Sequence, residues 1–83
     1  MYNEIKQNFI EKFFNKNFRY CVVSKKEALL DKIILLLPFD FYFNGNDLLT
    51  LNLGNDVNIT FKLEWNVTEH KNGHKVYCLN KVL

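Results

Sequence analysis

The sequence predicts an α+β fold, a two-layer sandwich in which two N-terminal helices pack on one face of a four-stranded antiparallel β-meander. Two patterns predict it. Apolar residues recur at spacings of three and four before Pro38 and at every second position after it. Turn-forming clusters at 44–47, 54–56 and 72–73 divide the second half into four strands. A sheet with one apolar face needs a cover, and the helical half is the part of the chain left to supply it.

Length and composition fit a single domain over residues 1–83. The chain is 48% apolar and 24% charged, with three glycines and one proline. These values are those of an ordinary globular protein. They leave no room for a flexible linker or a low-complexity tract.

The first helix is predicted over residues 1–17. Its large apolar side chains share one helical stripe because their spacings are three and four. These side chains are Tyr2, Ile5, Phe9, Ile10, Phe13 and Phe14. Asn15 and Asn17 suit a helix end, since asparagine tolerates the left-handed conformation there. The next segment, 18–23, is rich in β-forming residues and is a candidate fifth strand or an extended connector.

The second helix is predicted over residues 25–37. Ser24 and Glu27 have the spacing of a capping box, in which each side chain bonds the backbone amide of the other. A proline directly after the helix ends it, because its ring disfavours a helical conformation in the preceding residue. Leu35 and Leu36 make this helix apolar almost all round, so we expect it to be substantially buried.

The four strands are predicted at 39–43, 48–53, 57–69 and 74–82. Odd-numbered positions hold the large apolar residues in the first three, which places them on one face toward the helices. Residues 54–56 are predicted as a three-residue loop, because a two-residue loop would turn that face inside out. The resulting pairs are Leu53 with Val57, Leu51 with Ile59 and Leu49 with Phe61.

The last hairpin is predicted from Asn72-Gly73, a strong two-residue turn signal. The cross-strand pairs of that register are Lys71 with His74, Glu69 with Val76, Val67 with Cys78, and Glu64 with Lys81. Val76 and Cys78 thereby join the apolar face. Asn80, opposite Trp65, is the one mismatch in the pattern.

The charge balance disfavours a dedicated nucleic-acid binder, and the shortness of the apolar runs disfavours a membrane protein. Eleven basic and nine acidic residues give a net charge of +2, less than such binders usually carry. Residues 1–26 hold six basic and two acidic residues, whereas 27–60 hold one and five. The longest apolar run, 33–39, is too short to span a bilayer, and the first residues lack the apolar run of a signal peptide. We expect a cytoplasmic protein.

Residues for catalysis and metal binding are poorly represented, so we expect a protein that is not an enzyme and carries no cofactor or metal. Ser24 is the one serine and is assigned to a helix cap; phosphate-loop and nucleophile motifs are absent. His70, His74 and Cys78 have a ligand-like spacing, but the predicted turn directs the two histidines to opposite faces. Cys21 and Cys78 are expected to be two buried, inert thiols, with a disulfide between them as the alternative.

The outward face of the predicted sheet mixes aromatic, aliphatic, amide and lysine side chains, a combination typical of a protein-binding surface. The residues we expect to contact a partner are Tyr42, Leu48, Lys62, Asn66, Tyr77, Leu79 and Lys81. A merely solvated sheet face is the plainer alternative.

These observations predict a small non-enzymatic interaction protein that binds and inhibits a larger protein of unknown identity. Its compact size and its twelve asparagines, ten lysines and eight phenylalanines, which have A/T-rich codons, fit a phage or mobile-element antagonist of a host system. Such antagonists include anti-CRISPR-like inhibitors, and an immunity protein fits equally well.

Two further hypotheses stay open. One is a nucleic-acid-binding module that uses the lysines and tyrosines of the outward face, since single-stranded nucleic acids stack on aromatic rings and contact lysines through phosphates. The other is a homodimer formed through an exposed edge strand, either 39–43 or 74–82.

Overall fold

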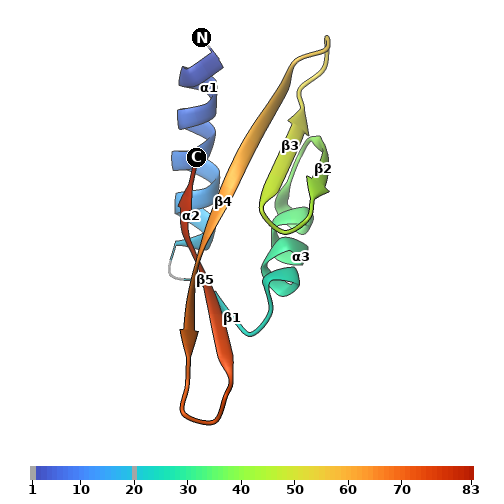
Figure 1. Cartoon of the computed structure of the whole chain (residues 1–83). Coiled ribbons are helices and arrows are strands. Elements are labelled where there is room, and N and C mark those ends of the chain that lie inside the picture. Colours follow the sequence, from blue (N-terminus) through green and yellow to red (C-terminus); the bar gives the residue numbers. More distant parts are fainter. Residues whose placement is uncertain (1, 20) are drawn as a thin grey trace.

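A computed structural model describes residues 2–19 and 21–83, the side chain of Tyr2 excepted (Figure 1). Met1 and Tyr20, which belong to the predicted first helix and to the candidate strand 18–23, lie outside the described residues. The elements in chain order are α1 (Tyr2–Phe9), the π-helical turn η1 (Ile10–Phe14), α2 (Asn15–Phe18), β1 (Val22–Val23), α3 (Lys26–Leu36), β2 (Asp40–Asn44), β3 (Leu48–Asn52), β4 (Asn58–Glu69) and β5 (Lys75–Val82).

The predicted fold class is confirmed. The helical segments lie in the first half of the chain, with β1 between α2 and α3, and the strands form a five-stranded antiparallel sheet in the order β1-β5-β4-β3-β2. The candidate fifth strand exists in its last two residues, where Val22 pairs with Cys78 and Val23 with Tyr77. The molecule is elongated, 49 × 20 × 17 Å, because the β4–β5 hairpin projects beyond the helices (Figure 1).

The first helical segment contains a π-helical turn that the sequence pattern did not predict. The backbone amide of Asn15 donates to the carbonyl of Ile10, five residues back. Successive spacings of four, as from Ile10 to Phe14 to Phe18, drift by about 40° each around an α-helix. The wider turn rotates the following residues back. As a result both Phe14 and Phe18 lie in the core, with 1% and 3% of their surfaces exposed.

The second helix, α3, begins at Lys26 and differs from the prediction in two respects. Its N-cap is Lys25, with no capping side-chain hydrogen bond, so the predicted Ser24–Glu27 capping box is wrong. The expectation that the helix is substantially buried holds for one side only, because α3 has the sheet on one side. Leu35 is 83% exposed and Leu36 53%.

The core lies between the helices and the odd-numbered face of β3 and β4, as predicted. Phe61 is completely buried, and its ring lies 5.3 Å from that of Phe9 and 5.5 Å from that of Phe14. The other buried apolar residues are Ile10, Phe18, Val23, Leu29, Leu30, Ile33, Leu49, Leu51, Ile59, Leu63 and Val82. The cluster joins the helices to β1, β3, β4 and β5, so one core supports the whole sheet.

The predicted register between β3 and β4 is confirmed. Leu49 pairs with Phe61 and Leu51 with Ile59, and Leu53 donates its amide to Val57 across the three-residue loop at 2.9 Å.

The predicted register between β4 and β5 is wrong over most of its length. The turn holds three residues, 71–73: His70 bonds His74 across it, and Gly73, at φ +83°, donates to the His70 carbonyl. This arrangement is a type I turn followed by a left-handed residue. Only the pairs Glu64–Lys81 and Leu63–Val82 agree with the predicted register.

Asn80 is the reason that both registers coexist in one hairpin. It is an extra residue on β5, because Lys81 pairs with Glu64 while Leu79 pairs with Trp65. Such a bulge shifts the pairing by one residue and exchanges the faces of everything beyond it. The mismatch found in the sequence at Asn80 is therefore the bulge itself.

Candidate protein-binding surfaces

Part of the predicted outward face is assembled as expected. Leu48 pairs with Lys62, and Lys62 in turn exchanges two backbone hydrogen bonds of 2.9 Å with Leu83. Tyr42 occupies the neighbouring row, across from Thr50, and is 63% exposed. Thr50 is buried beneath this surface, with its hydroxyl 3.0 Å from that of Thr60.

Tyr77 and Leu79 do not belong to this face, contrary to the prediction. The Asn80 bulge and the three-residue turn rotate them to the helix side, where they are half-buried against the core. The Nζ of Lys26, on α3, lies 5.9 Å from the centre of the Tyr77 ring. The outward positions are taken by Val76 and Cys78 instead.

Asn66 and Lys81 are on the outward face as predicted, but each has a neighbour within the sheet. The Asn66 amide donates to Oδ1 of Asn80 at 3.1 Å, and Lys81 pairs with Glu64 across the strands. Five of the seven predicted contact residues therefore share a face, and Tyr77 and Leu79 lie on the other.

The sequence pattern missed a second surface, a groove between α2 and α3. It has a volume of about 330 Å³ and is lined by Asn17, Phe18, Cys21, Lys32, Leu35 and Leu36. We call these six residues the α2–α3 groove. Phe18 is buried and forms its floor, and the two leucines are its most exposed apolar walls. Lys32 Nζ lies 3.8 Å from the Cys21 sulfur at its rim.

A signal for this groove was present in the sequence. A helix that is apolar all round is buried only where neighbours cover every side. This chain has a single sheet, and the sheet takes the face of α3 that carries Leu29, Leu30 and Ile33. The sequence therefore indicates that some apolar residues of α3 stay outside the core, and the structure shows that these include Leu35 and Leu36.

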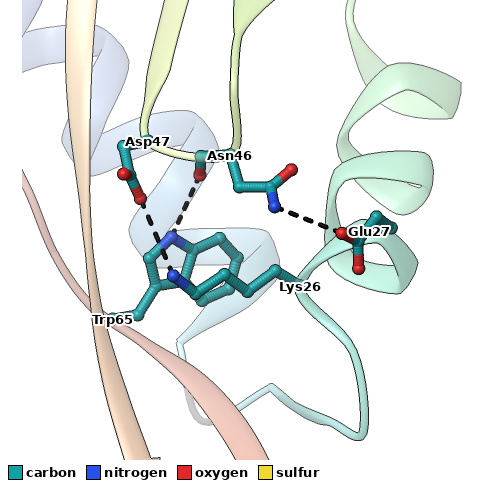
Figure 2. Close-up of polar contacts among 5 residues, drawn as sticks. All are labelled: Lys26, Glu27, Asn46, Asp47 and Trp65. Carbon is teal, nitrogen blue, oxygen red and sulfur yellow. Dashed lines mark hydrogen bonds and ion pairs between the residues drawn. The ribbon is translucent and has the colours of Figure 1, made fainter.

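Polar contacts connect α3, the β2–β3 turn and β4 in one cluster (Figure 2). The Asn46 amide donates to Oε1 of Glu27 at 3.2 Å, and the Trp65 indole N–H donates to the Asn46 carbonyl at 3.0 Å. Lys26 forms an ion pair of 3.8 Å with Asp47, and its ammonium lies 5.6 Å from the Trp65 ring centre.

This cluster connects α3, the β2–β3 turn and β4. A backbone hydrogen bond at Glu27 lowers the pKa of that carboxyl below its ordinary value, and the Asn46 amide lowers it further. A lowered pKa keeps the carboxylate charged, whereas a general acid or base at neutral pH needs a raised one. The lowered pKa favours the charged form of Glu27, which accepts the hydrogen bond from Asn46.

Metal-ligand residues are dispersed over residues 2–19 and 21–83, where no three His, Cys, Asp or Glu side chains gather closely enough to hold an ion. His70 and His74 are exposed at the base of the hairpin turn. Cys21 and Cys78 are both free thiols, but the expectation that they are buried is wrong, because each is only partly buried.

No known protein family, curated protein or solved structure matches this chain. None of the described helices has the length and apolar character needed to cross a bilayer.

Proposed function

We propose that this protein is a non-catalytic binding module that docks on a larger protein through the α2–α3 groove and blocks it. The observation that supports the proposal is the exposure of Leu35 (83%) and Leu36 (53%) on the wall of this groove. Large exposed aliphatic side chains beside a hollow are typical of protein-interaction sites.

The energetics favour a partner that covers these leucines. Full burial of a leucine contributes about 1.5–3 kcal/mol, and most of that is unrealised at Leu35 and Leu36 in the free protein. Asn17 and Lys32 supply polar groups at the rim. An apolar centre with a polar border is the usual anatomy of such an interface.

The chemistry of the groove also indicates the partner segment. Its one charged residue is Lys32, so a segment that inserts apolar side chains and places a carboxylate beside this lysine is complementary. An amphipathic helix with an acidic residue at its border has these features.

Blocking is the activity we propose for the bound state, by covering a surface that the partner uses elsewhere. The exposed leucines of the groove support a protein that acts by occupying a surface of its partner. We infer that the protein is a phage or mobile-element antagonist of a host system, such as an anti-CRISPR-like inhibitor, or an immunity protein.

The experiment is affinity capture from a host lysate with three forms of the protein. Wild type is expected to retain a specific protein and to inhibit it after purification, while Leu35→Ser/Leu36→Ser loses both effects. Val67→Ser is the matched control, because Val67 is also exposed (52%) but lies on the distal hairpin. Capture that is unchanged in the leucine variant, or that recovers no protein above background, would overturn the proposal.

Binding of nucleic acid is the competing function and is tested in parallel. Lys62 and Lys81 share the outward face with Tyr42, whereas Tyr77 lies on the other side of the sheet. A mobility shift with single-stranded RNA or DNA that weakens steeply with salt, together with no protein capture, would replace protein docking as the function.

A further inference from the structure

The free edge of the sheet at β2 differs from the opposite edge. In the strand order β1-β5-β4-β3-β2, β2 is terminal along its whole length, and in Figure 1 it forms the border of the sheet. At the other end, β1 covers β5 at Tyr77 and Cys78. Of the two edges considered from the sequence, only β2 is an uninterrupted edge.

This edge lacks several of the features that normally prevent strand-to-strand association. Natural edge strands are very short or carry charged side chains, especially lysine, or proline or a bulge, and Asp40 is the one charged residue of β2. The five residues of β2, Asp40–Asn44, include neither lysine nor proline, and their pairing with β3 is regular from Asp40–Asn52 to Asn44–Leu48. The backbone groups on the outer side of β2 are therefore presented in a regular row.

We propose that β2 is a homodimerisation strand, which pairs antiparallel with β2 of a second copy about a two-fold axis at Tyr42. The two five-stranded sheets then form one continuous ten-stranded sheet. The interface is isologous, since each copy contributes the same strand. This proposal does not depend on the α2–α3 groove, which lies on the helical layer.

The register follows from the side chains of β2. Centring on Tyr42 pairs all five residues: Asp40 faces Asn44 of the second copy, Phe41 faces Phe43, and Tyr42 faces its own counterpart. A shift by one residue would place phenylalanine opposite a polar-face residue and put the two helical layers on opposite sides. In the centred register, the helical faces of the two sheets lie on one side of the dimer and the outward faces on the other.

The side chains are compatible with this pairing. Phe41 and Phe43 are half-buried, with ring centres 5.7 Å apart in an edge-to-face arrangement, and the second copy extends this aromatic row. Aromatic cross-strand pairs stabilise antiparallel sheets. Tyr42, 63% exposed, and Phe39, 40% exposed, gain cover at the same edge.

Charge does not oppose the dimer. Asp40 is the one ionisable acid or base in β2 apart from the Tyr42 phenol, and it faces an asparagine of the second copy. The two Asp40 residues lie four residues apart along the paired β2 strands, which corresponds to roughly 14 Å at the rise per residue of a β-strand. That separation exceeds the Debye length of about 8 Å at physiological salt.

A charge-swap experiment tests this register. Wild type is expected to be dimeric in size-exclusion chromatography with light scattering. Tyr42→Lys and Tyr42→Glu each place like charges face to face on the axis, and we expect each to raise the dimer dissociation constant by about tenfold or more. An equimolar mixture of the two variants is expected to restore the dimer as a heterodimer.

Thr68→Lys is the matched control, because it adds a lysine on the outward face of β4 away from the edge and is expected to remain dimeric. A monomeric wild type would overturn the proposal, as would a dimer that persists in Tyr42→Lys or a mixture that stays monomeric. Leu35→Ser/Leu36→Ser is expected to remain dimeric, and Tyr42→Lys is expected to capture the partner as wild type does. The oligomeric state therefore tests the dimer and partner capture tests the groove, each independently of the other.

Discussion

The indole N–H of Trp65 donates a hydrogen bond of 3.0 Å to the backbone carbonyl of Asn46, which ties the middle of β4 to the β2–β3 turn. The same turn is held by α3 through Glu27 and Lys26 (Figure 2). Because β2 follows α3 directly, these contacts fix how the edge hairpin sits against the helix. Both proposed surfaces therefore depend on this cluster for their relative position.

Trp65→Phe removes the indole hydrogen bond while keeping an aromatic ring. The Asn46 carbonyl loses its side-chain partner, and a lost hydrogen bond at a half-buried group costs about 1–2 kcal/mol of unfolding free energy. Urea unfolding followed by circular dichroism measures this change. Val67→Ala is the control, since it also truncates a side chain of β4 but at an exposed position, and an equal effect of the two variants would contradict the structural role of Trp65.

The lowered pKa of Glu27 predicts a pH dependence of stability. A carboxyl whose pKa is lower in the folded state stabilises the protein above its unfolded value and loses this contribution as pH falls through the folded value. The ordinary pKa here is 4.5, and neutral pH lies well above it. Wild type is therefore expected to be more stable than Glu27→Gln at neutral pH. The difference closes as pH falls below that value. Thermal unfolding of both proteins across this range measures it, and a gap that widens in acid would contradict the assignment.

Asn46→Ala provides a second measurement at the same carboxyl. The Asn46 amide is the second-largest cause of the lowered pKa of Glu27, after the backbone hydrogen bond at Glu27 itself. Removing it is expected to raise the pKa toward the ordinary value without abolishing the shift. An NMR titration of the Glu27 carboxyl in both proteins measures this, and an unchanged pKa would show that the 3.2 Å contact is not formed in solution.

The parts of the fold that could be predicted were those in which a local signal and the apolar pattern agree. The three-residue loop at 54–56 is such a case, because only this length keeps leucines opposite apolar partners. The β4–β5 hairpin is the opposite case. Asn72-Gly73 is compatible with a two-residue and a three-residue turn, and a bulge at Asn80 lets the longer turn coexist with the predicted pairs near Lys81.

The groove could not be located from the sequence because burial depends on which side of a helix is covered. The spacing of Leu29, Ile33 and Leu36 is equally helical, yet only the first two are buried. The π-helical turn is similar, since it corrects a drift that is visible in the spacing of Ile10, Phe14 and Phe18 only after the helix is placed on the sheet.

The corrected β5 register predicts which of its residues stabilise the fold. Leu79→Ala is expected to lower the unfolding free energy by about 1–3 kcal/mol, because Leu79 packs against the core. Val76→Ala, on the outward face, is expected to cost less than about 1 kcal/mol. Equal effects of the two variants, or a larger effect of Val76→Ala, would contradict this register and support the one with a two-residue turn. Chemical unfolding of the two variants compares them directly.

Cys21 offers a chemical test of the α2–α3 groove that needs no change to its leucines. In a Cys78→Ser background Cys21 is the one remaining thiol, and it lines the groove beside Leu36 and Lys32. A bulky maleimide on Cys21 fills the space that we assign to the partner, so labelled protein is expected to lose partner capture while keeping its circular dichroism spectrum. The reciprocal variant, Cys21→Ser labelled at Cys78, carries the same group on the opposite side of the sheet and is expected to capture normally. Equal loss in both would indicate that labelling perturbs the fold, and equal retention would place the partner away from the groove.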